Sequence, residues 1–545
     1  MLAKFSQETR AAALAALTPE QPFDLLIIGG GITGVGAARD AALRGYRVVL
    51  VDKRDFASGT SSKSTKLVHG GLRYLEHFEF ALVFEALQER RVLLEQAPHL
   101  VQPQPILFPI YKGAENGFLK MTAGMWLYDT LSLFRNVRRH KMLGPGGVEK
   151  SVPGLRDENL TGAAHFYDAN THDARLTLAN AQQAHAAGAA LLTYCAVQDF
   201  LRDDEGALVG VRVRDELAGK DYEIHARLLL NCTGPWTDTV IQMADPSQPT
   251  RLRPTKGAHL VFSRERLPLD EALMVSAPQD NRPVFIIPWR GETIIGTTDT
   301  DYEGSFDDIP VTAEDVTYLL EVANYSFPEA NLTASDVQSS WAGLRPLIQD
   351  PSAESEGATS REHEIWEAPE GLISIAGGKL TTYRIMGRQL IDVAAQKLEE
   401  RVGLPERPAI DTAALPLPGA EQPLPQANPT RLPDDVWTHL VRYYGVHVYR
   451  IAERVAKDAM LGERLIEGMP YIWAELPHAV ENEQCLTADD FLARRSWLIY
   501  EAPHRGREVL DEVVRRLSTL LGWDEPRCAR ERQRYEHELS LLVGQ

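Results

Sequence analysis

The amino-acid sequence predicts an α/β fold, α+β overall, that is built from three kinds of structure. An apolar run leads into a glycine-rich turn and a helix near residue 29, which indicates a parallel strand–helix–strand unit. Short alternating strands between residues 190 and 299 indicate an antiparallel sheet, and helical periodicity over 434–545 indicates a separate helical domain.

The order of these patterns suggests two domains that interleave along the chain before the helical domain begins. We expect an N-terminal leader helix within 1–22, interleaved domains over 23–405, a proline-rich linker over 406–433 and the helical domain over 434–545. The strand–helix–strand domain is expected to take about 23–80, 150–250 and 340–400, and the antiparallel domain about 81–149 and 251–339.

The glycine-rich turn has the spacing Gly29-x-Gly31-x-x-Gly34 and lies between two apolar runs, the second of which, 48–51, ends on Asp52. Gly29 permits a tight turn, Gly31 lets the backbone approach a pyrophosphate, and Gly34 lets helix and strand pack closely. The helix N-terminus offers unpaired N–H groups to phosphates, and Asp52 can accept hydrogen bonds from ribose hydroxyls. This Rossmann-like unit predicts that the chain binds an adenine dinucleotide, the alternative being an ordinary glycine turn in an α/β sheet.

The remaining elements follow from hydrophobic spacing along the chain. Apolar residues at helical intervals predict helices over 76–97, 118–134 and 176–187, and a helix that starts near Thr382. Alternating or continuous apolar runs predict strands over 190–197, 208–214, 221–229, 257–263, 284–289, 293–298 and 372–378, with a hairpin turn at Arg290-Gly291-Glu292.

Composition argues against several classes of function. The chain has 57 Lys and Arg against 76 Asp and Glu, a formal charge of −19, which argues against nucleic acid as a partner because phosphate contacts need clustered cations. Its four cysteines are scattered without a CxxC pair, so neither a metal site nor a disulfide framework is expected, and a cytoplasmic location fits. No run of 18 apolar residues is present, so a membrane-spanning helix is not expected.

Three predicted strands end in small-residue or glycine turns, at Gly29, Gly234 and Gly378. Ligands of open parallel sheets bind beyond the carboxyl ends of the strands, so segments that are far apart in the sequence meet around one ligand. A long cofactor that several distant segments cross, and that a second domain covers, is typical of FAD rather than NAD. We therefore predict FAD as the cofactor.

Longer motifs extend this interpretation. They are, in chain order, residues 59–76 (GTSSKSTKLVHGGLRYLE), 231–236 (NCTGPW), 256–259 (KGAH), 295–299 (IGTTD), 343–346 (GLRP) and 377–384 (GGKLTTYR). Together these motifs closely resemble the signatures of FAD-dependent glycerol-3-phosphate dehydrogenases over about residues 24–390. The departures are small: a longer leader, Asp52 where many members have Glu, and Lys63 in the Ser/Thr loop. The resemblance implies a FAD-binding domain of the glutathione-reductase/amino-acid-oxidase type, an interleaved antiparallel substrate domain and an all-helical C-terminal domain.

The resemblance also implies a reaction, the oxidation of sn-glycerol 3-phosphate to dihydroxyacetone phosphate by hydride transfer from C2 to N5 of FAD, with electrons passed to a quinone. A dianionic phosphate needs fixed cations, and arginine can bind two of its oxygens. A neutral histidine can take the hydroxyl proton. We therefore predict His259 and Arg345 as catalytic residues. The predicted substrate-binding residues are Arg73, Tyr74, His259, Arg345 and Lys379.

The predicted cofactor-binding residues come from the glycine turn, the Ser/Thr loop and the other two strand ends. Hydroxyls and backbone N–H groups make the Ser/Thr loop better suited to phosphate binding than to the role of a solvated linker. The residues are Gly29, Gly31, Ile32, Thr33, Gly34, Asp52, Lys53, Thr60, Ser61, Ser62, Thr65, Lys66, Leu67, His69, Val197, Thr233, Gly234, Trp236, Gly378, Lys379, Leu380, Thr381 and Thr382.

Alternatives to this function stay open at the level of the sequence. An amino-acid-oxidase-like flavoenzyme would also need arginine, for the carboxylate of its substrate. A flavin-binding scaffold without turnover is a second alternative. Within the favoured function, a glycerol-3-phosphate oxidase that uses oxygen is the alternative to a quinone-linked enzyme.

A quinone lies in the bilayer, so an enzyme that reduces it must reach the membrane. Residues 118–134 are rich in apolar side chains and are followed by Arg135, Arg138, Arg139 and Lys141, a combination typical of an interfacial helix, the alternative being a core helix. We expect a cytoplasmic protein that binds peripherally to the inner face of the cell membrane. Whether the C-terminal domain forms a homodimer, caps the fold or contacts the membrane stays open.

Overall fold

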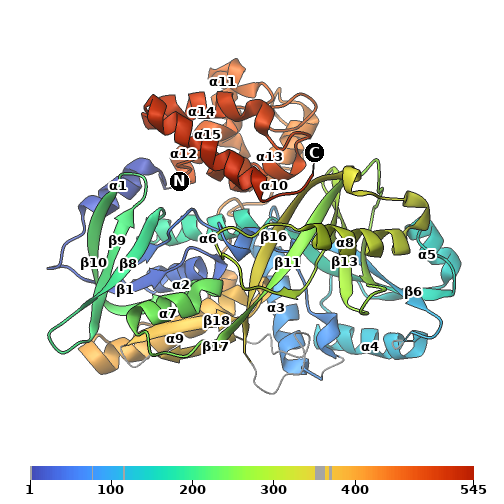
Figure 1. Cartoon of the computed structure of the whole chain (residues 1–545), viewed down its shortest axis with the longest axis horizontal. Helices are drawn as coiled ribbons and strands as arrows, with labels where there is room; N and C mark the ends of the chain where they lie inside the picture. The colour runs from blue at the N-terminus through green and yellow to red at the C-terminus, as the bar shows by residue number, and fades with distance from the viewer. Residues whose placement is uncertain (1–2, 76–77, 115–116, 350–362, 368–370, 545) are drawn as a thin grey trace.

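The computed structural model describes residues 3–75, 78–114, 117–349, 363–367 and 371–544. Two sheet domains lie side by side, and the helices of the C-terminal part lie above them (Figure 1). Strands β11 (Leu252–Ser263) and β16 (Val337–Ile348) run through the middle of the molecule, between the two halves.

The first sheet contains the predicted dinucleotide-binding unit. Its five central strands, β18, β10, β1, β2 and β7, are parallel, so their carboxyl ends meet at one edge. Antiparallel strands extend the sheet beyond β18 and beyond β10. The strands are β17 (His363–Glu367), β18 (Leu372–Gly377), β10 (Lys220–Asn231), β1 (Phe23–Ile28), β2 (Val48–Val51), β7 (Ala190–Leu192), β8 (Cys195–Arg202) and β9 (Leu208–Asp215).

The helices before the C-terminal part cover the faces of the two sheets. The predicted helices over 118–134 and 176–187 correspond to α4 and α6, and the helix predicted over 76–97 begins only at Phe80 in the described residues. The helices are α1 (Gln7–Ala15), α2 (Ile32–Leu43), α3 (Phe80–Gln96), α4 (Phe118–Leu131), α5 (Pro145–Ser151), α6 (Asp173–Ala186), α7 (Thr237–Ala244), α8 (Ala313–Ser326) and α9 (Tyr383–Val402).

Alternate residues of β1 face opposite sides of the first sheet, as the twofold period of a strand requires. Leu25 and Ile27 belong to a hydrophobic core shared with α2, α6 and α9. Leu26 and Ile28 belong to a second core, shared with α7 and strands β8 to β10. Because both faces are covered, the sheet edge at the carboxyl ends of the strands is where a ligand can approach.

The second sheet is antiparallel except for the pair β12–β4, and its hairpin turn at Arg290-Gly291 lies where the sequence predicts it. Helix α8 packs on one face, and α3 and α4 pack on the other. Along the sheet the strands are β15 (Thr300–Asp301), β11, β14 (Glu292–Gly296), β13 (Pro283–Trp289), β12 (Ala272–Ser276), β4 (Val101–Tyr111), β6 (Leu160–Thr171) and β3 (Leu67–Val68), with β16 beside β11 and β5 (Lys141–Leu143) beside β6.

The sequence predicts no strand at the positions of three long strands, β4, β6 and β16. Strands β6 and β16 pair within the second sheet, so this domain reaches into ranges that the sequence assigns to the first domain. The sequence of β4 is unusual for a strand because it contains Pro103, Pro105 and Pro109. These prolines are spaced by even numbers of residues, so their missing N–H groups fall on one edge, while β4 pairs along its whole length with β6 on the other.

The C-terminal part is helical and docks on both sheet domains through buried ion pairs. Asp55, which follows β2, accepts hydrogen bonds from Arg494 at 2.7 Å and from Arg495 at 3.0 Å. Arg290 of the β13–β14 turn pairs with Glu501 at 3.1 Å.

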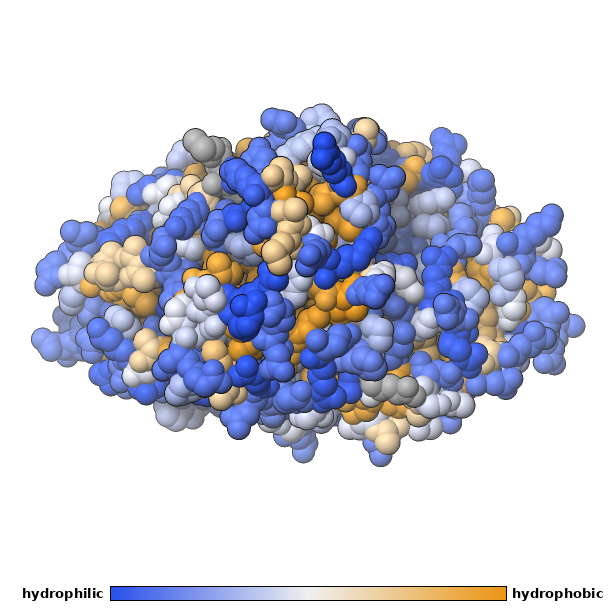
Figure 2. Space-filling view, turned by 90° about the horizontal axis from the view of Figure 1, so that it is seen from above, coloured by the Kyte–Doolittle hydropathy of each residue, from blue (hydrophilic) through white to orange (hydrophobic). Residues whose placement is uncertain are grey.

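The face seen from above is covered mainly by hydrophilic side chains (Figure 2). The helices are α10 (Asp434–Tyr444), α11 (Val448–Lys457), α12 (Glu475–Asn482), α13 (Leu498–Glu501), α14 (Arg507–Leu521) and α15 (Glu525–Ser540).

Candidate active site

A cavity of about 790 Å³ lies at the carboxyl ends of the parallel strands, where the second sheet meets the first. Its lining comes from the turns after β1, β10 and β18, from loop 58–65, and from β11 and β16. The predicted residues that line it are Gly29, Gly31, Ile32, Thr33, Asp52, Lys53, Thr60, Ser61, Thr65, Leu67, His69, Tyr74, Val197, Thr233, Gly234, Trp236, His259, Arg345, Gly378, Lys379, Leu380 and Thr381.

The glycine turn after β1 has the close contacts that its sequence predicts. Gly29 has φ +110°, and a Cβ there would lie 2.6 Å from the carbonyl oxygen of Cys232. A Cβ on Gly34 would lie 1.9 Å from the carbonyl oxygen of Gly29, so helix α2 can approach β1 only with glycine at this position. At the helix N-terminus, the N–H of Ile32 donates to Ser61 Oγ at 2.9 Å. The turn therefore presents the start of α2 to the cavity.

Asp52 ends β2 and lies beside this turn. Its Oδ2 accepts a hydrogen bond from the N–H of Gly30 at 2.6 Å, and its Oδ1 accepts one from the N–H of Arg54 at 2.8 Å. Burial raises the pKa of the Asp52 carboxyl to about 6, although both backbone N–H groups favour the ionised form. A carboxylate held in this way can receive hydrogen bonds from ribose hydroxyls, so Asp52 marks the end of the cavity suited to an adenosine.

His259 lies on β11 and is buried in the wall of the cavity. Its ring stacks on Trp341, with ring centroids 4.9 Å apart and an interplanar angle of 17°. Nε2 lies 2.9 Å from Thr65 Oγ1, and Nδ1 has no hydrogen-bond partner among the described residues. Burial, together with the charges of Lys66 and Arg345, holds the pKa of His259 well below its usual 6.5. The imidazole is therefore neutral at pH 7 and can accept a proton.

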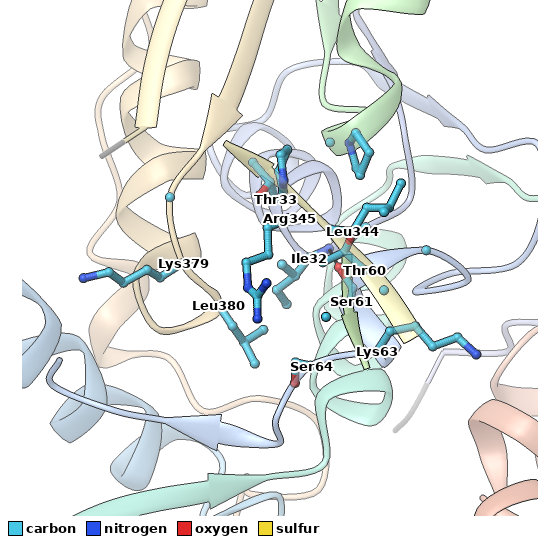
Figure 3. Close-up of a pocket in the computed structure, with 18 of the residues that line it drawn as sticks. Ile32, Thr33, Thr60, Ser61, Lys63, Ser64, Leu344, Arg345, Lys379 and Leu380 are labelled. Atoms are coloured by element: carbon cyan, nitrogen blue, oxygen red, sulfur yellow. Dashed lines mark hydrogen bonds between the residues drawn. The ribbon is translucent and has the colours of Figure 1, made fainter. Parts of the chain in front are cut away.

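Arg345 lies on β16, and its guanidinium group reaches the same cavity. Nη1 donates to Asp299 Oδ1 at 2.8 Å, and Nη2 donates to Thr297 Oγ1 at 3.2 Å. Figure 3 shows the side chain extending toward Leu380 and Ser64. Because Asp299 and Thr297 hold the plane of the guanidinium, Arg345 is oriented before an anion binds.

Tyr74 and Lys379 form a second polar group in the wall. Lys379 Nζ lies 3.5 Å from the centre of the Tyr74 ring, and its side chain extends away from Arg345 (Figure 3). The ring of His69 lies near Phe285, with centroids 6.4 Å apart. The prediction for the fifth substrate residue, Arg73, concerns a side chain outside the described part of the structure.

Four of the residues predicted to contact the cofactor do not line the cavity. Gly34 packs against Gly29, and Ser62 accepts a hydrogen bond from Lys66 through its carbonyl oxygen at 2.6 Å. Lys66 is buried and forms an ion pair with Asp173 at 2.9 Å. Thr382 is also buried, at the start of α9. These residues support the backbone beneath the cavity. A sequence motif alone does not distinguish such supporting residues from residues that contact a ligand.

Several lining residues go beyond the sequence prediction. Asp299 ends a recognised motif, but its pairing with Arg345 could be found only from the fold. Arg282, at the start of β13, donates to the carbonyl oxygen of Asp299 and also lines the cavity. Leu541 and Leu542 follow α15 in the C-terminal part and carry no sequence signal for a site.

Comparisons with known proteins match most of the chain. A family model described as "FAD dependent oxidoreductase" matches residues 24–391, and one described as "C-terminal domain of alpha-glycerophosphate oxidase" matches residues 410–528. The chain is 37% identical over 538 residues to a glycerol-3-phosphate dehydrogenase of Synechocystis sp., and the alignment covers 95% of this chain and 96% of the relative. It is 37% identical over 535 residues to an aerobic glycerol-3-phosphate dehydrogenase of Bacillus subtilis, covering 96% and 95%.

A solved structure is similar over almost the whole chain. It is the glycerol-3-phosphate dehydrogenase from Bacillus halodurans complexed with FAD, with a TM-score of 0.81, 34% identity, and coverage of 99% of this chain and 98% of that chain. The fold and the cavity thus define an FAD-dependent oxidoreductase, and FAD is its cofactor. Within that class, the chain belongs to the glycerol-3-phosphate dehydrogenase family.

The residues of the cavity fit this cofactor. The N-terminus of α2 and the hydroxyls of loop 58–65 can hold a pyrophosphate, and Asp52 can hold a ribose. The turns after β10 and β18 line the cavity together with His259, so the far end has room for a flavin beside the two predicted catalytic residues.

Replacing Gly31 by alanine separates cofactor binding from folding. A Cβ on Gly31 would meet only Ser61 Oγ, at 3.2 Å, a contact that a shift of a few tenths of an ångström relieves. We expect Gly31→Ala to fold normally and to bind FAD at least about tenfold more weakly, because the methyl group occupies the path of the pyrophosphate. Flavin fluorescence titration of the apoprotein measures this. Gly124→Ala, at a half-buried position of α4 with nothing within 4 Å, is the matched control. Unchanged FAD affinity in Gly31→Ala would contradict the assignment.

Proposed function

We propose that this chain oxidises sn-glycerol 3-phosphate at C2 to dihydroxyacetone phosphate and passes the electrons to a membrane quinone. The observation that carries the proposal is the meeting of a neutral histidine, His259, with an oriented arginine, Arg345, in the cavity of a flavoenzyme. The names of the relatives, which are glycerol-3-phosphate dehydrogenases, support the same substrate.

In this proposal each residue has one task. Arg345 binds the anionic substrate, and Lys379 with Tyr74 closes the other side of the pocket. His259 takes the proton of the C2 hydroxyl, while its contacts with Trp341 and Thr65 keep the ring in place. The bound FAD supplies the acceptor for the hydride that leaves C2.

The experiment is anaerobic bleaching of the yellow holoenzyme. Glycerol 3-phosphate should bleach the flavin absorbance, whereas amino acids should not, which separates this function from that of an amino-acid-oxidase-like enzyme. A holoenzyme that neither glycerol 3-phosphate nor amino acids bleach would support a non-catalytic scaffold. Peroxide yield compared with quinone turnover, on one preparation, then decides between oxygen and quinone as the acceptor.

Arg345→Ala is expected to lower kcat/KM for glycerol 3-phosphate by roughly 10²-fold, because hydrogen bonds from a cation to an anion are lost. Steady-state kinetics with a quinone analogue measures this loss. Arg253→Ala is the matched control, since Arg253 lies on the neighbouring strand and pairs with Asp301 at 2.6 Å but does not line the cavity. Equal activity of the Arg345 variant and the control would exclude Arg345 from substrate binding.

A quinone acceptor requires contact with the membrane, and we propose that α4 provides it at the inner face of the cell membrane. Helix α4 turns Met125 and Tyr128 into the core but exposes Leu119 to 84% and Trp126 to 53%. Within the described residues, every helix is too short or too polar to cross a bilayer. The exposed apolar side chains on and beside this helix are Phe78, Phe80, Phe84, Phe118, Leu119, Trp126, Leu127, Leu133, Phe134 and Val137.

The apolar surface is followed by the cationic residues that an anionic membrane would attract. Neutralising Arg135, Arg138, Arg139 and Lys141 together is expected to reduce flotation with anionic liposomes at least about tenfold, since each cation near such a surface contributes about 1 kcal/mol. Met460→Asp should leave flotation unchanged because the exposed Met460 follows α11, which lies at the top of the molecule in Figure 1, whereas α4 lies at the bottom. Undiminished flotation after neutralisation would remove this surface from the proposal.

A further inference from the structure

The segment 537–544, at the end of α15 and just after it, lies against the cavity that binds FAD. Glu538, Leu541 and Leu542 line the cavity together with Lys53 and Arg54, which directly follow Asp52. This segment lies beyond residue 528, where the matched family models end. The C-terminal part therefore contributes side chains to the wall of the cofactor site, although its core is separate from that of the FAD-binding domain.

Side-chain contacts tie the start of this segment to both sheet domains. Glu538 pairs with Arg54 at 3.3 Å, and His537 Nε2 lies 2.9 Å from Asp308 Oδ1. Arg54 also lies 3.9 Å from Asp308, so the three parts of the chain meet around one guanidinium group.

Backbone contacts continue along the rest of the segment. The N–H of Val311 donates to the carbonyl oxygen of Leu541 at 3.1 Å. Ser340 Oγ on β16 accepts from the N–H of Val543 at 2.8 Å and donates to its carbonyl oxygen at 3.1 Å. A Cβ on Gly544 would lie 2.4 Å from the carbonyl oxygen of Gln338, so the segment lies directly on β16.

The end of the cavity that this segment covers is the end marked by Asp52. The ammonium group of Lys53 lies 4.3 Å from the centre of the Trp236 ring and pairs with Asp307. The rings of Trp236 and Phe306 are 6.3 Å apart. The wall at this end thus consists of three separate pieces of chain, 53–54, 306–309 and 538–542, held together by ion pairs and hydrogen bonds.

We propose that residues 538–542 form part of the FAD site, close its adenosine half and set the rate at which FAD leaves. The C-terminal part then acts on the cofactor, independently of any role toward substrate or acceptor. A cofactor that leaves through this end has to separate the segment from Arg54, Val311 and Ser340. The contacts that break on opening belong to the barrier for release, and removing them accelerates release.

The test measures the release of FAD from the full-length holoenzyme. Free FAD is cleaved by a phosphodiesterase, which increases its fluorescence, so the rate of the fluorescence rise reports dissociation and not catalysis. We expect the double variant Leu541→Asp, Leu542→Asp to release FAD at least tenfold faster than the wild type. Leu520→Asp, at an exposed leucine of α14, is the matched control and should release FAD at the wild-type rate.

A second variant keeps the test decisive if the double variant fails to fold. Ser340→Ala removes the two hydrogen bonds to Val543, while Ser340 itself does not line the cavity. We expect FAD release at least about twofold faster in this variant, since each hydrogen bond that is lost contributes to holding the segment. A wild-type release rate in Ser340→Ala, together with a wild-type rate in the double variant if it folds, would overturn the proposal, as would an equal increase in Leu520→Asp.

Discussion

His259→Asn is expected to slow the reduction of bound FAD by glycerol 3-phosphate about 10²- to 10⁴-fold, the usual contribution of a general base. The amide of asparagine lies near the position of Nδ1, so the variant loses both the base and the hydrogen bond between Nε2 and Thr65 Oγ1, which are 2.9 Å apart in the native protein. The glycine turn and Asp52, which line the other end of the cavity, are unchanged, so the FAD content should stay near the wild-type level. Anaerobic stopped-flow absorbance of the flavin measures the rate directly.

The pH dependence of the wild-type reaction tests the same assignment. Burial and the charges of Lys66 and Arg345 hold the pKa of His259 well below 6.5, so the ring becomes protonated only at lower pH. The rate constant for reduction at saturating substrate should stay constant from about pH 8 down to about 6.5 and should fall only below that range. A base with an ordinary histidine pKa would already lose half of its activity at the lower limit.

His225→Asn provides a matched control for the loss of activity. His225 lies on β10, outside the residues that line the cavity, and is also partly buried. This variant should reduce FAD at the wild-type rate. If His259→Asn retained a rate within tenfold of this control, another group of the cavity would have to accept the proton of the C2 hydroxyl.

The dinucleotide-binding half of the site could be predicted because its chemistry is local in the sequence. Gly29, Gly31 and Asp52 lie within about thirty residues, and the spacing of the glycines already determines the turn. The family resemblance also located His259 and Arg345, and the structure brings both of them to the cavity. The spacing of the motifs could not show which residue each side chain pairs with. Asp299, for example, lies between β14 and β15 but pairs with Arg345 of β16, which is distant in the sequence.

The parts of the fold that escaped prediction have physical reasons. Strand β4 contains three prolines, which are rare inside strands and hide it in the sequence, and its strand conformation depends on pairing with β6. Lys66 lies within a motif rich in predicted cofactor contacts, but its side chain turns inward because it pairs with Asp173 of a distant helix. Leu541 and Leu542 reach the cavity only through the docking of the whole C-terminal part.

Lys66→Met is expected to destabilise the protein by about 3–5 kcal/mol, the usual cost of leaving one partner of a buried ion pair uncompensated. Lys66 is 1% exposed and Asp173 is 0% exposed, and their charged groups are 2.9 Å apart. Burial lowers the pKa of Lys66 to about 8, against the opposing effect of Asp173, so the ammonium group is still charged at pH 7. Methionine fills most of the space but leaves the carboxylate of Asp173 inside the protein without its cation.

The double variant Lys66→Met, Asp173→Asn shows whether the loss comes from the uncompensated charge. Asparagine removes the charge, and its side-chain oxygen can keep accepting from Ser64, which donates to Asp173 from its N–H at 3.2 Å and from Oγ at 2.7 Å. Most of the lost stability should therefore return, as buried ion pairs can often be replaced by neutral groups at little cost. Urea unfolding followed by circular dichroism, with FAD present in excess, measures both variants. A double variant as unstable as Lys66→Met would instead mean that the cation itself holds the loop, through its hydrogen bond to Ser62 and its position 4.5 Å from the Trp497 ring.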